Sequence, residues 1–429
     1  MSGSDMGSLK ISRSTFNRNK VVKRQAVPMQ SGPHVKSEVD DGEQKGSFLG
    51  GALFLLKIPD ISIEDCMFTG NRAAATGGAI SILAPGVDAS DAKIVGCTFD
   101  GNSAAGDSNA TTLGGGLYIS GGVLRASIKD SNFTKNGANT SGGALYGRKF
   151  SSLKISHSLF FENRVVKDDG KSFGDSVNGT RYLGGVDIAV GGAILLTDVS
   201  ETFIVKSSFA RNKAQDGGGI YAANFGGSLL KIERTVFSSN EANEGGGAMS
   251  AVRTKYLISG SIFWKNTAGY GGAVEGSSVA VDISQCSFKN NTSIDNGGGM
   301  YLWVGDAATA LLISKKKQIC LAIELEQETS TLLVESTKFT ENVAMHSDGG
   351  ALGLMSTNAT ISKSNFTGNV GYGQGGAIHS AHVKWQQAPF LDGFDESSFP
   401  EAILPETERN RLADLLVNAM RDKLEARPV

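Results

Sequence analysis

Short runs in which apolar and polar residues alternate recur along most of the chain. In Leu9-Lys10-Ile11 and Leu153-Lys154-Ile155 the apolar residues fall two apart, which places them on one face of a β-strand. β-branched and aromatic residues dominate these runs, as strands prefer. The pattern predicts a chain built from many short strands.

The first recurring element is a Phe followed three residues later by Asn. It occurs eleven times, with Ile or Val five residues before the Phe and Ser, Thr or Cys two residues before it. The Phe residues are Phe16, Phe68, Phe99, Phe133, Phe160, Phe209, Phe237, Phe263, Phe288, Phe339 and Phe366. Such agreement at a fixed spacing identifies a repeat protein.

The second recurring element is Gly-Gly, then Ala or Gly, then an aliphatic residue or Met. It also occurs eleven times, with fourth positions at Leu53, Ile80, Leu117, Leu145, Ile194, Ile220, Met249, Val274, Met300, Leu352 and Ile378. Gly and Asn tolerate positive φ, so the two elements mark turns between the strands.

One repeat cannot close a core by itself. Many copies repeat every 25 to 30 residues, which suits one coil of two or three short strands. Stacking the coils puts each Phe above the next at the ~4.8 Å strand spacing. We therefore predict an all-β, single-stranded parallel β-helix of about 11–12 coils.

The repeat domain spans residues 1–384, with insertions at 20–47, 164–190 and 303–331. The third insertion contains Leu311-Leu312-Ile313-Ser314, which favours a degenerate coil over a hairpin that leaves the rod. Residues 385–429 form an irregular linker followed by a short C-terminal α-helix. Its apolar stripe of Leu412, Leu415, Leu416 and Ala419 suits a helix that packs on the rod or caps it, or else binds a partner.

Composition narrows the possible partners. The 429 residues carry a net charge of −2, which gives no reason to expect nucleic acid or an anionic membrane as partner. No run approaches the 18 apolar residues of a membrane helix. The chain as given has no signal peptide, and its first repeat begins by residue 9. We read this start as that of a fragment, so the missing signal is weak evidence against secretion.

Three of the four cysteines, Cys66, Cys97 and Cys286, stand two residues before a Phe. Ser or Thr fills this position elsewhere, so we expect small buried side chains there; a Cys66–Cys97 disulfide between adjacent coils is the alternative. Cys320 has no evident partner. No His/Cys cluster or CxxC motif is present, and we predict no metal site and no cofactor.

Candidate catalytic residues do not form a consistent set. The acidic residues three before a Phe, Asp65 and Asp130, are replaced elsewhere by other residue types, as at Arg13, Gly96 and His157. We interpret His379 and His382 as a surface pair, and Asp168 and Asp169 as solvated charges rather than Ca²⁺ ligands. We therefore name no catalytic, cofactor-binding or metal-binding residue, and an enzyme is the less favoured reading.

Repeated F-x-x-N alternating with G-G-A-[ILV] resembles the repeats of the chlamydial polymorphic outer membrane proteins. The resemblance covers about residues 9–380 and implies a right-handed parallel β-helix displayed at a cell surface. It also implies a non-catalytic adhesive or structural scaffold, extracellular or on the cell surface. We expect it to bind a glycan or a surface protein through its lateral faces and the loops at 20–47, 84–91, 103–113 and 164–190. The alternative is a carbohydrate-active enzyme resembling the β-helical polysaccharide lyases and hydrolases.

Overall fold

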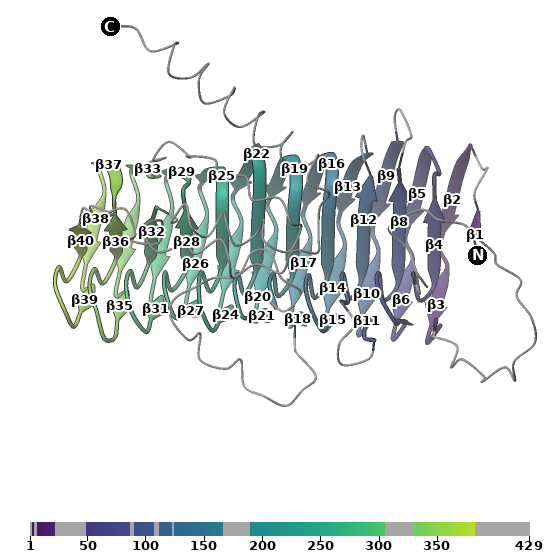
Figure 1. Cartoon of the computed structure of the whole chain (residues 1–429), viewed down its shortest axis with the longest axis horizontal. Coiled ribbons are helices and arrows are strands. Elements are labelled where there is room, and N and C mark those ends of the chain that lie inside the picture. The colour runs from purple at the N-terminus through teal and green to yellow at the C-terminus, as the bar shows by residue number, and fades with distance from the viewer. Residues whose placement is uncertain are drawn as a thin grey trace, which may run out of the picture.

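The described part of the chain is a rod of stacked parallel strands (Figure 1). The computed structural model describes residues 2–3, 7–21, 49–85, 90–106, 111–121, 124–165, 189–304 and 330–381. These residues contain no helix. The predicted C-terminal helix lies outside the described residues. The parallel β-helix is confirmed, and its right-handed sense stays a prediction.

Each coil contributes to three sheets. Sheet A has nineteen strands, sheet B eleven and sheet C ten. In sheet A the strands that follow the glycine element are β4 (Leu53–Leu56), β8 (Ile80–Ala84), β12 (Leu117–Gly121), β28 (Val274–Ser277), β32 (Met300–Trp303), β36 (Leu352–Met355) and β40 (Ile378–Ala381). The two-residue β1 (Ser2–Gly3) pairs with β4 and follows no glycine element. Those that precede the Phe are β2 (Ser8–Ser12), β5 (Asp60–Glu64), β9 (Ser90–Val95), β13 (Leu124–Lys129), β29 (Ala280–Ser284), β33 (Ser330–Glu335) and β37 (Thr357–Ser362). Four strands span both parts: β16 (Leu145–Ser156), β19 (Ile194–Val205), β22 (Ile220–Glu233) and β25 (Met249–Ser259).

Sheet B is formed by the Phe-containing strands, one from each of eleven coils, which we number 1–11 from Phe16 to Phe366. These strands are β3 (Thr15–Asn17), β6 (Met67–Thr69), β10 (Thr98–Asp100), β14 (Asn132–Thr134), β17 (Leu159–Phe161), β20 (Ser208–Ala210), β23 (Val236–Ser238), β26 (Ile262–Trp264), β30 (Ser287–Lys289), β34 (Lys338–Thr340) and β38 (Asn365–Thr367). Sheet C contains β7 (Arg72–Ala73), β11 (Ser103–Ala104), β15 (Gly137–Ala138), β18 (Arg164–Val165), β21 (Lys213–Ala214), β24 (Glu241–Ala242), β27 (Thr267–Ala268), β31 (Thr292–Ser293), β35 (Val343–Ala344) and β39 (Val370–Gly371).

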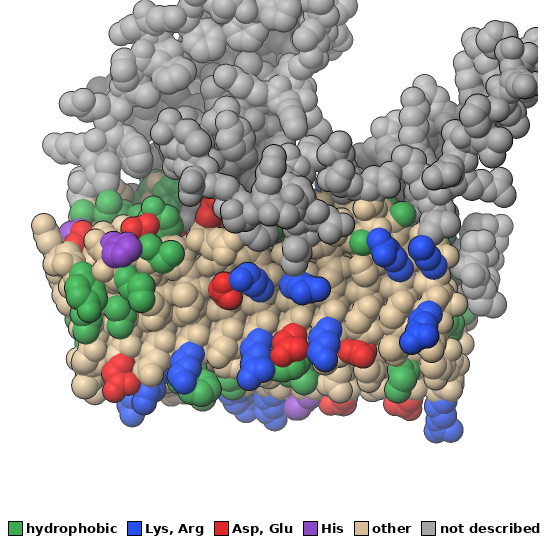
Figure 2. All heavy atoms as spheres, turned by 90° about the horizontal axis from the view of Figure 1, so that it is seen from below, with side chains coloured by type: hydrophobic (Ala, Val, Ile, Leu, Met, Phe, Trp, Pro, Cys, Tyr) green, Lys and Arg blue, Asp and Glu red, His purple; other side chains and the backbone are tan. Residues whose placement is uncertain are grey.

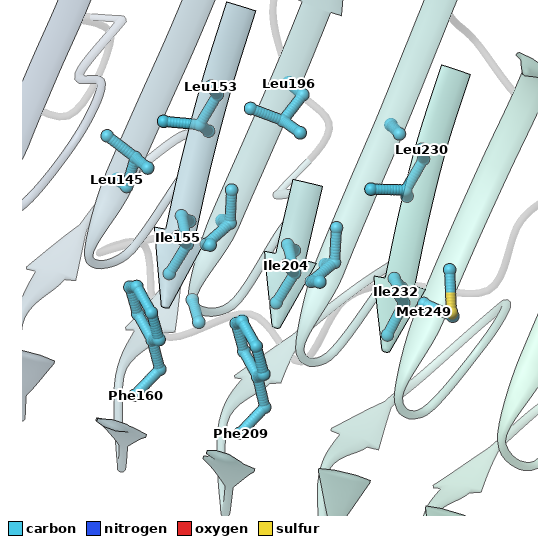
Figure 3. Packing of buried hydrophobic residues seen from close by; sticks show 14 of the residues in the cluster. Leu145, Leu153, Ile155, Phe160, Leu196, Ile204, Phe209, Leu230, Ile232 and Met249 are labelled. Atoms are coloured by element: carbon cyan, nitrogen blue, oxygen red, sulfur yellow. The ribbon is translucent and has the colours of Figure 1, made fainter. Parts of the chain in front are cut away.

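The Phe side chains form one continuous stack inside the rod. Neighbouring ring centroids lie 4.5–5.0 Å apart with nearly parallel rings. The nine rings of coils 2–10 are fully buried. Figure 3 shows Ile155 and Phe160 of one coil repeated by Ile204 and Phe209 in the next. Burying a Phe is worth ~1.5–3 kcal/mol, so this stack is a major part of the core.

The two later insertions do not add coils to the stack. The rings of Phe160 and Phe209 are 4.7 Å apart, and those of Phe288 and Phe339 are 4.8 Å apart. No coil fits in either interval, because adjacent strands themselves are ~4.8 Å apart. The expectation that residues 303–331 supply a degenerate coil at this place is therefore wrong. Most of both insertions, 166–188 and 305–329, lies outside the described residues.

The conserved spacing around each Phe is explained by two hydrogen-bond ladders. Each Asn of coils 1–10 donates both its backbone N–H and its Nδ2 to Oδ1 of the next Asn, as Asn136 does to Asn163 at 3.0 Å. In coils 4–11 the Ser, Thr or Cys two before the Phe accepts a bond from the equivalent backbone N–H of the previous coil, as Ser158 Oγ does from Ser131. The same hydroxyl donates within its own turn, from Ser158 Oγ to the Ser156 carbonyl.

The glycine pair has two different physical roles. The first glycine of every pair has positive φ, between 56° and 69°. The second glycine leaves no space for a side chain: in the ten pairs from Gly51 to Gly350, an added Cβ would lie 2.0–2.4 Å from a carbonyl oxygen of the next coil. The element therefore allows both a left-handed turn and close approach of successive coils.

Candidate interaction surface

The outer face of sheet B becomes apolar in coils 5–8. Each of its strands directs the residues on either side of the Phe outward, and the register aligns them into two columns. In coils 5–8 these columns contain Leu159, Phe161, Val236, Ile262 and Trp264. Ile262 is 45% exposed and Trp264 is 41% exposed. We call these five residues, together with Arg211 and Lys265, the sheet B surface.

Two cations lie over aromatic rings of the sheet B surface. The Lys265 Nζ is 4.7 Å from the Trp264 ring centroid, and the Arg211 guanidinium carbon is 5.6 Å from that of Phe161. Both distances are within the range of cation–π attraction. Arg211 and Lys265 occupy the same turn position, two residues after a Phe, with φ of 55° and 54°. Lys265 lies over the ring of its own coil, whereas Arg211 of coil 6 lies over the ring of Phe161 in coil 5.

The edges of this surface carry more positive than negative charge. Lys206 and Arg234 occupy the turn three residues before the Phe, on the opposite edge from Arg211 and Lys265. Glu162 forms an ion pair with Arg211 at 3.4 Å. An exposed ion pair of this kind is weak. A ligand can therefore compete with Glu162 for the charge of Arg211. Flat aromatic faces flanked by cations suit the stacking of a sugar ring and the pairing of an anionic group.

The outer face of sheet C has a different character. Figure 2 shows acidic and basic side chains interspersed along the rod, with hydrophobic side chains gathered toward its C-terminal end. At that end Ile294, Met345 and Tyr372 are 45%, 48% and 73% exposed. They follow equivalent strands of coils 9, 10 and 11. These three exposed apolar side chains therefore lie on coils 9–11, at the C-terminal end of the described stack.

A second apolar cluster lies on the outer side of sheet A. It contains the buried side chains of Tyr118, Tyr146, Leu195 and Tyr221. The rings of Tyr118 and Tyr146 are stacked at 5.3 Å. Burial raises the pKa of Tyr146 above its usual value. All four residues directly follow the fourth position of a glycine element, a position on which the sequence analysis makes no prediction.

A fully buried carboxylate continues the same column at Glu275. Ser250 Oγ donates to Glu275 Oε2 at 2.6 Å, and Trp303 Nε1 donates to Oε1 at 2.5 Å. Nearby Tyr256 is also fully buried. Burial raises the pKa of Tyr256 well above its usual value, and the charge of Glu275 acts in the same direction. Because Glu275 has no exposed surface, it does not face a ligand in solution.

The cysteines are free thiols in the described residues. Cys97 Sγ donates to the carbonyls of Val95 at 3.3 Å and Ile63 at 3.4 Å, and Cys66 Sγ donates to that of Glu64 at 3.1 Å. The thiols therefore replace the hydroxyls of the Ser/Thr column. The prediction of small buried side chains is confirmed, and the alternative of a Cys66–Cys97 disulfide is wrong. Cys320 lies outside the described residues.

The other sequence candidates are not brought together. Asp65 and Asp130 occupy equivalent turns two coils apart, with φ of 51° and 50°. His379 Nε2 lies 3.6 Å from Asp348 Oδ2, while His382, Asp168 and Asp169 lie outside the described residues. In the part of the chain that the structure describes, no three His, Cys, Asp or Glu residues gather as metal ligands would. The described ranges also contain no helix able to cross a membrane.

Comparisons with known proteins agree with this architecture. The Chlamydia polymorphic membrane protein repeat matches residues 65–82, 130–148 and 363–381, each of which runs from a Phe–Asn element into the following glycine element. Metabotropic glutamate receptor-like protein R of Dictyostelium discoideum is 32% identical over 151 residues. That match covers 33% of this chain and 9% of the relative. No solved structure matched.

The family is one of membrane proteins of Chlamydia, which is consistent with a place at a cell surface. The stacked parallel strands and the three matched segments together identify the repeating unit. The chain carries Chlamydia polymorphic membrane protein repeats, folded as a parallel β-helix.

Proposed function

We propose that the chain is a non-catalytic scaffold at a cell surface or outside the cell, and that its sheet B surface binds a glycan. The observation that carries the proposal is the pair Trp264–Lys265, with the indole 41% exposed and the ammonium 4.7 Å from its centroid. A surface protein is the alternative partner.

The rod explains why such a surface would be effective. Its backbone is held by parallel pairing across every coil, so the side chains on its lateral faces are presented at fixed spacing along the axis. Phe161 and Trp264 lie three coils apart on the same outward column, which corresponds to about 14 Å. Two aromatic platforms at that separation, each with its own cation, suit an extended chain of sugars with anionic groups.

The test is a glycan array that includes neutral and anionic glycans, read with the purified chain and two variants. Trp264→Ala should weaken binding at least about tenfold, equivalent to ~1.4 kcal/mol. Met67→Ala is the matched control, because Met67 is an exposed residue of the same sheet face in coil 2, and it should leave binding unchanged. Equal binding by the wild type and Trp264→Ala would contradict the proposal. Release of new reducing ends from a bound glycan would support the enzyme alternative instead.

A further inference from the structure

Several Asn-x-Ser/Thr sequons, the acceptor sequence for N-linked glycosylation, occur along the chain. Their first residues are Asn109, Asn132, Asn139, Asn178, Asn290, Asn291, Asn358 and Asn365. Asn109 and Asn178 lie outside the described residues. A chain rich in Asn, Ser and Thr contains such triplets by chance. The fold therefore has to decide which of the others can carry a sugar.

The sequon at Asn132 is open to solvent. Asn132 is an exposed residue of β14, directly before the buried Phe133. Thr134 lies two residues further on, which places it on the same outward face of the strand, and its Oγ1 donates to Asp100 Oδ1 at 2.6 Å. A glycan on the Asn132 amide would therefore extend into solvent without displacing a core side chain.

Two further sequons have the same outward placement. Asn365 occupies the equivalent position in β38 and is exposed, as is its strand partner Lys338 in coil 10. Thr367 Oγ1 donates to Asn365 Oδ1 at 3.0 Å, a bond that uses the amide oxygen and not the nitrogen to which a sugar is attached. Asn358 is an exposed residue of β37 in sheet A, and its partner Thr331 is exposed as well.

The fold excludes a sugar at Asn291 and at Asn139. The Asn291 amide donates to the Phe263 carbonyl and to Asn342 Oδ1, each at 2.9 Å, and Asn291 is fully buried. A sugar there would interrupt the Asn ladder, so folded chains carry none at this site. The Nδ2 of Asn139 is also buried. Asn290 has its Oδ1 buried in a turn with φ of 54°, and we assign no sugar to it.

We propose that Asn132, Asn358 and Asn365 are sites of N-linked glycosylation. The proposal rests on the proposed place at a cell surface or outside the cell, because sequons are modified in secreted chains. The Asn Nδ2 attacks the anomeric carbon of a phosphate-activated sugar donor. The N–C bond forms, the C–O bond to the phosphate breaks, the phosphate leaves and the amide releases one proton. A segment similar to part of this chain occurs in a protein of the eukaryote Dictyostelium discoideum, and eukaryotes carry out this modification.

The three sites leave the sheet B surface uncovered. Asn132 in coil 4 and Asn365 in coil 11 stand in one outward column of sheet B. The sheet B surface occupies coils 5–8, between them, and Asn358 is on a different sheet. Glycans at these positions would therefore flank Trp264 and not cover it, which is compatible with the proposed binding of an external glycan.

The test is peptide mapping of the full chain purified from the cells that produce it. An amidase that removes N-linked sugars, used in heavy-oxygen water, converts each modified Asn to Asp with one heavy oxygen atom. Asn132, Asn358 and Asn365 should carry this label. Asn139 and Asn291 should not. Absence of the label from Asn132, or its presence at Asn291 in the folded chain, overturns the proposal.

Matched variants separate the sequon from the fold. Thr134→Ala removes the acceptor sequence and should abolish the label at Asn132, whereas Thr134→Ser keeps an acceptor sequence and should retain it. Asn132→Gln should increase the gel mobility by one glycan step, with the thermal unfolding of the enzymatically deglycosylated protein unchanged. A Thr134→Ala variant that still carries the label would contradict modification through this sequon.

Location is measured separately, so that the two proposals can fail independently. A membrane-impermeant amine reagent applied to intact cells reports whether the chain is accessible at the surface, and the culture medium is assayed for released chain. A chain that is at the surface or in the medium and has no sugar at Asn132 overturns the glycosylation alone. A chain found only inside the cell overturns the location on which both proposals rest.

Discussion

The Nδ2 of Asn212 donates a hydrogen bond to the Oδ1 of Asn240 in the next coil, 2.9 Å away. The backbone N–H of Asn212 reaches the same oxygen at 3.1 Å, and its amide also donates to the Phe160 carbonyl at 3.0 Å. One side chain thus joins three successive coils. The Asn-to-Asn hydrogen bonds repeat from Asn19 to Asn369. The Asn residues therefore do more than form turns: together they connect the coils along the described rod.

Removing one member of this ladder should be costly. In Asn240→Ala the two donors of Asn212, the carbonyl of Phe209 and the Oδ1 of Asn266 each lose a partner inside the rod. An unsatisfied buried polar group costs ~1–3 kcal/mol, so we expect a loss of at least ~3 kcal/mol in the free energy of unfolding. Urea unfolding measures it. Asn132→Ala, at an exposed position of sheet B, is the control and should stay within ~0.5 kcal/mol.

The second glycine of each pair should not accept even a methyl group. An added Cβ at Gly218 would lie 2.4 Å from the Gly247 carbonyl oxygen and 2.5 Å from that of Glu241. Gly218→Ala should therefore force coils 7 and 8 apart and cost more than ~3 kcal/mol, in the range of severe core mutations. The control is Gly137→Ala, because a Cβ added at Gly137 would meet only the Arg164 carbonyl oxygen, at 3.7 Å. Thermal unfolding of the two variants checks the expectation. Similar melting temperatures for the two would contradict the close approach of the coils.

Alkaline pH should weaken the fold through the buried thiols. Burial is the main cause that raises the pKa of Cys97, and likewise that of Cys286, from 9.0 to about 11. A raised folded pKa gives stability that is complete below the unfolded pKa and is lost as pH rises through the folded pKa. The urea midpoint should therefore fall between about pH 9 and about pH 11.

The contribution of one thiol can be separated from that of other alkaline groups. Cys97→Ser restores the residue type most common in this column and removes the titration while retaining a donor to the Val95 carbonyl. Its urea midpoint should fall less steeply over the same pH interval than that of the wild type. Parallel pH profiles for the two proteins would show that this thiol does not contribute.

Turn positions three residues before the Phe should be sensitive to β-branching but not to charge. Arg234 has φ of 48°, and Gly260 occupies the equivalent place in the next coil with φ of 55°. We expect Arg234→Gly to be neutral or to stabilise by up to ~1 kcal/mol, because a left-handed conformation costs an L-residue ~1–2 kcal/mol. Arg234→Val should destabilise relative to both. Unfolding by urea gives the order, and a Val variant as stable as the Gly variant would contradict a conformational constraint.

The stacked core could be predicted from the sequence because each of its columns uses one kind of side chain. Phe, Asn and the glycine pair recur at a fixed spacing, and the parallel strand spacing then follows from packing. The turn three before the Phe was not predicted, since its left-handed backbone accepts Asp65, His157 and Arg234 alike. Residue identity there carries no common chemistry, and only φ is shared.

The candidate surface was only partly accessible to sequence reasoning. Lateral faces were expected to bind, but Trp264 and Phe161 were not singled out, because one aromatic residue beside the Phe carries no periodic signal. Their shared column appears only when coils 5 and 8 are in register. Glu275 was not predicted to be buried, because a Glu in a strand is expected to face solvent. In the structure Ser250 and Trp303 cover it and donate hydrogen bonds to its carboxylate.

The stack of coils is tested most directly by the distance between spin labels at Met67→Cys and Ile262→Cys, in a background where the native cysteines are replaced by Ser. Both residues lie on one outward column of sheet B, in coils 2 and 8. Six coil steps predict a narrow distance distribution centred near ~29 Å, and moving the first label to Thr98 should shorten it by about 5 Å. A broad distribution, or a distance that does not change with the number of coils between the labels, would contradict the β-helix.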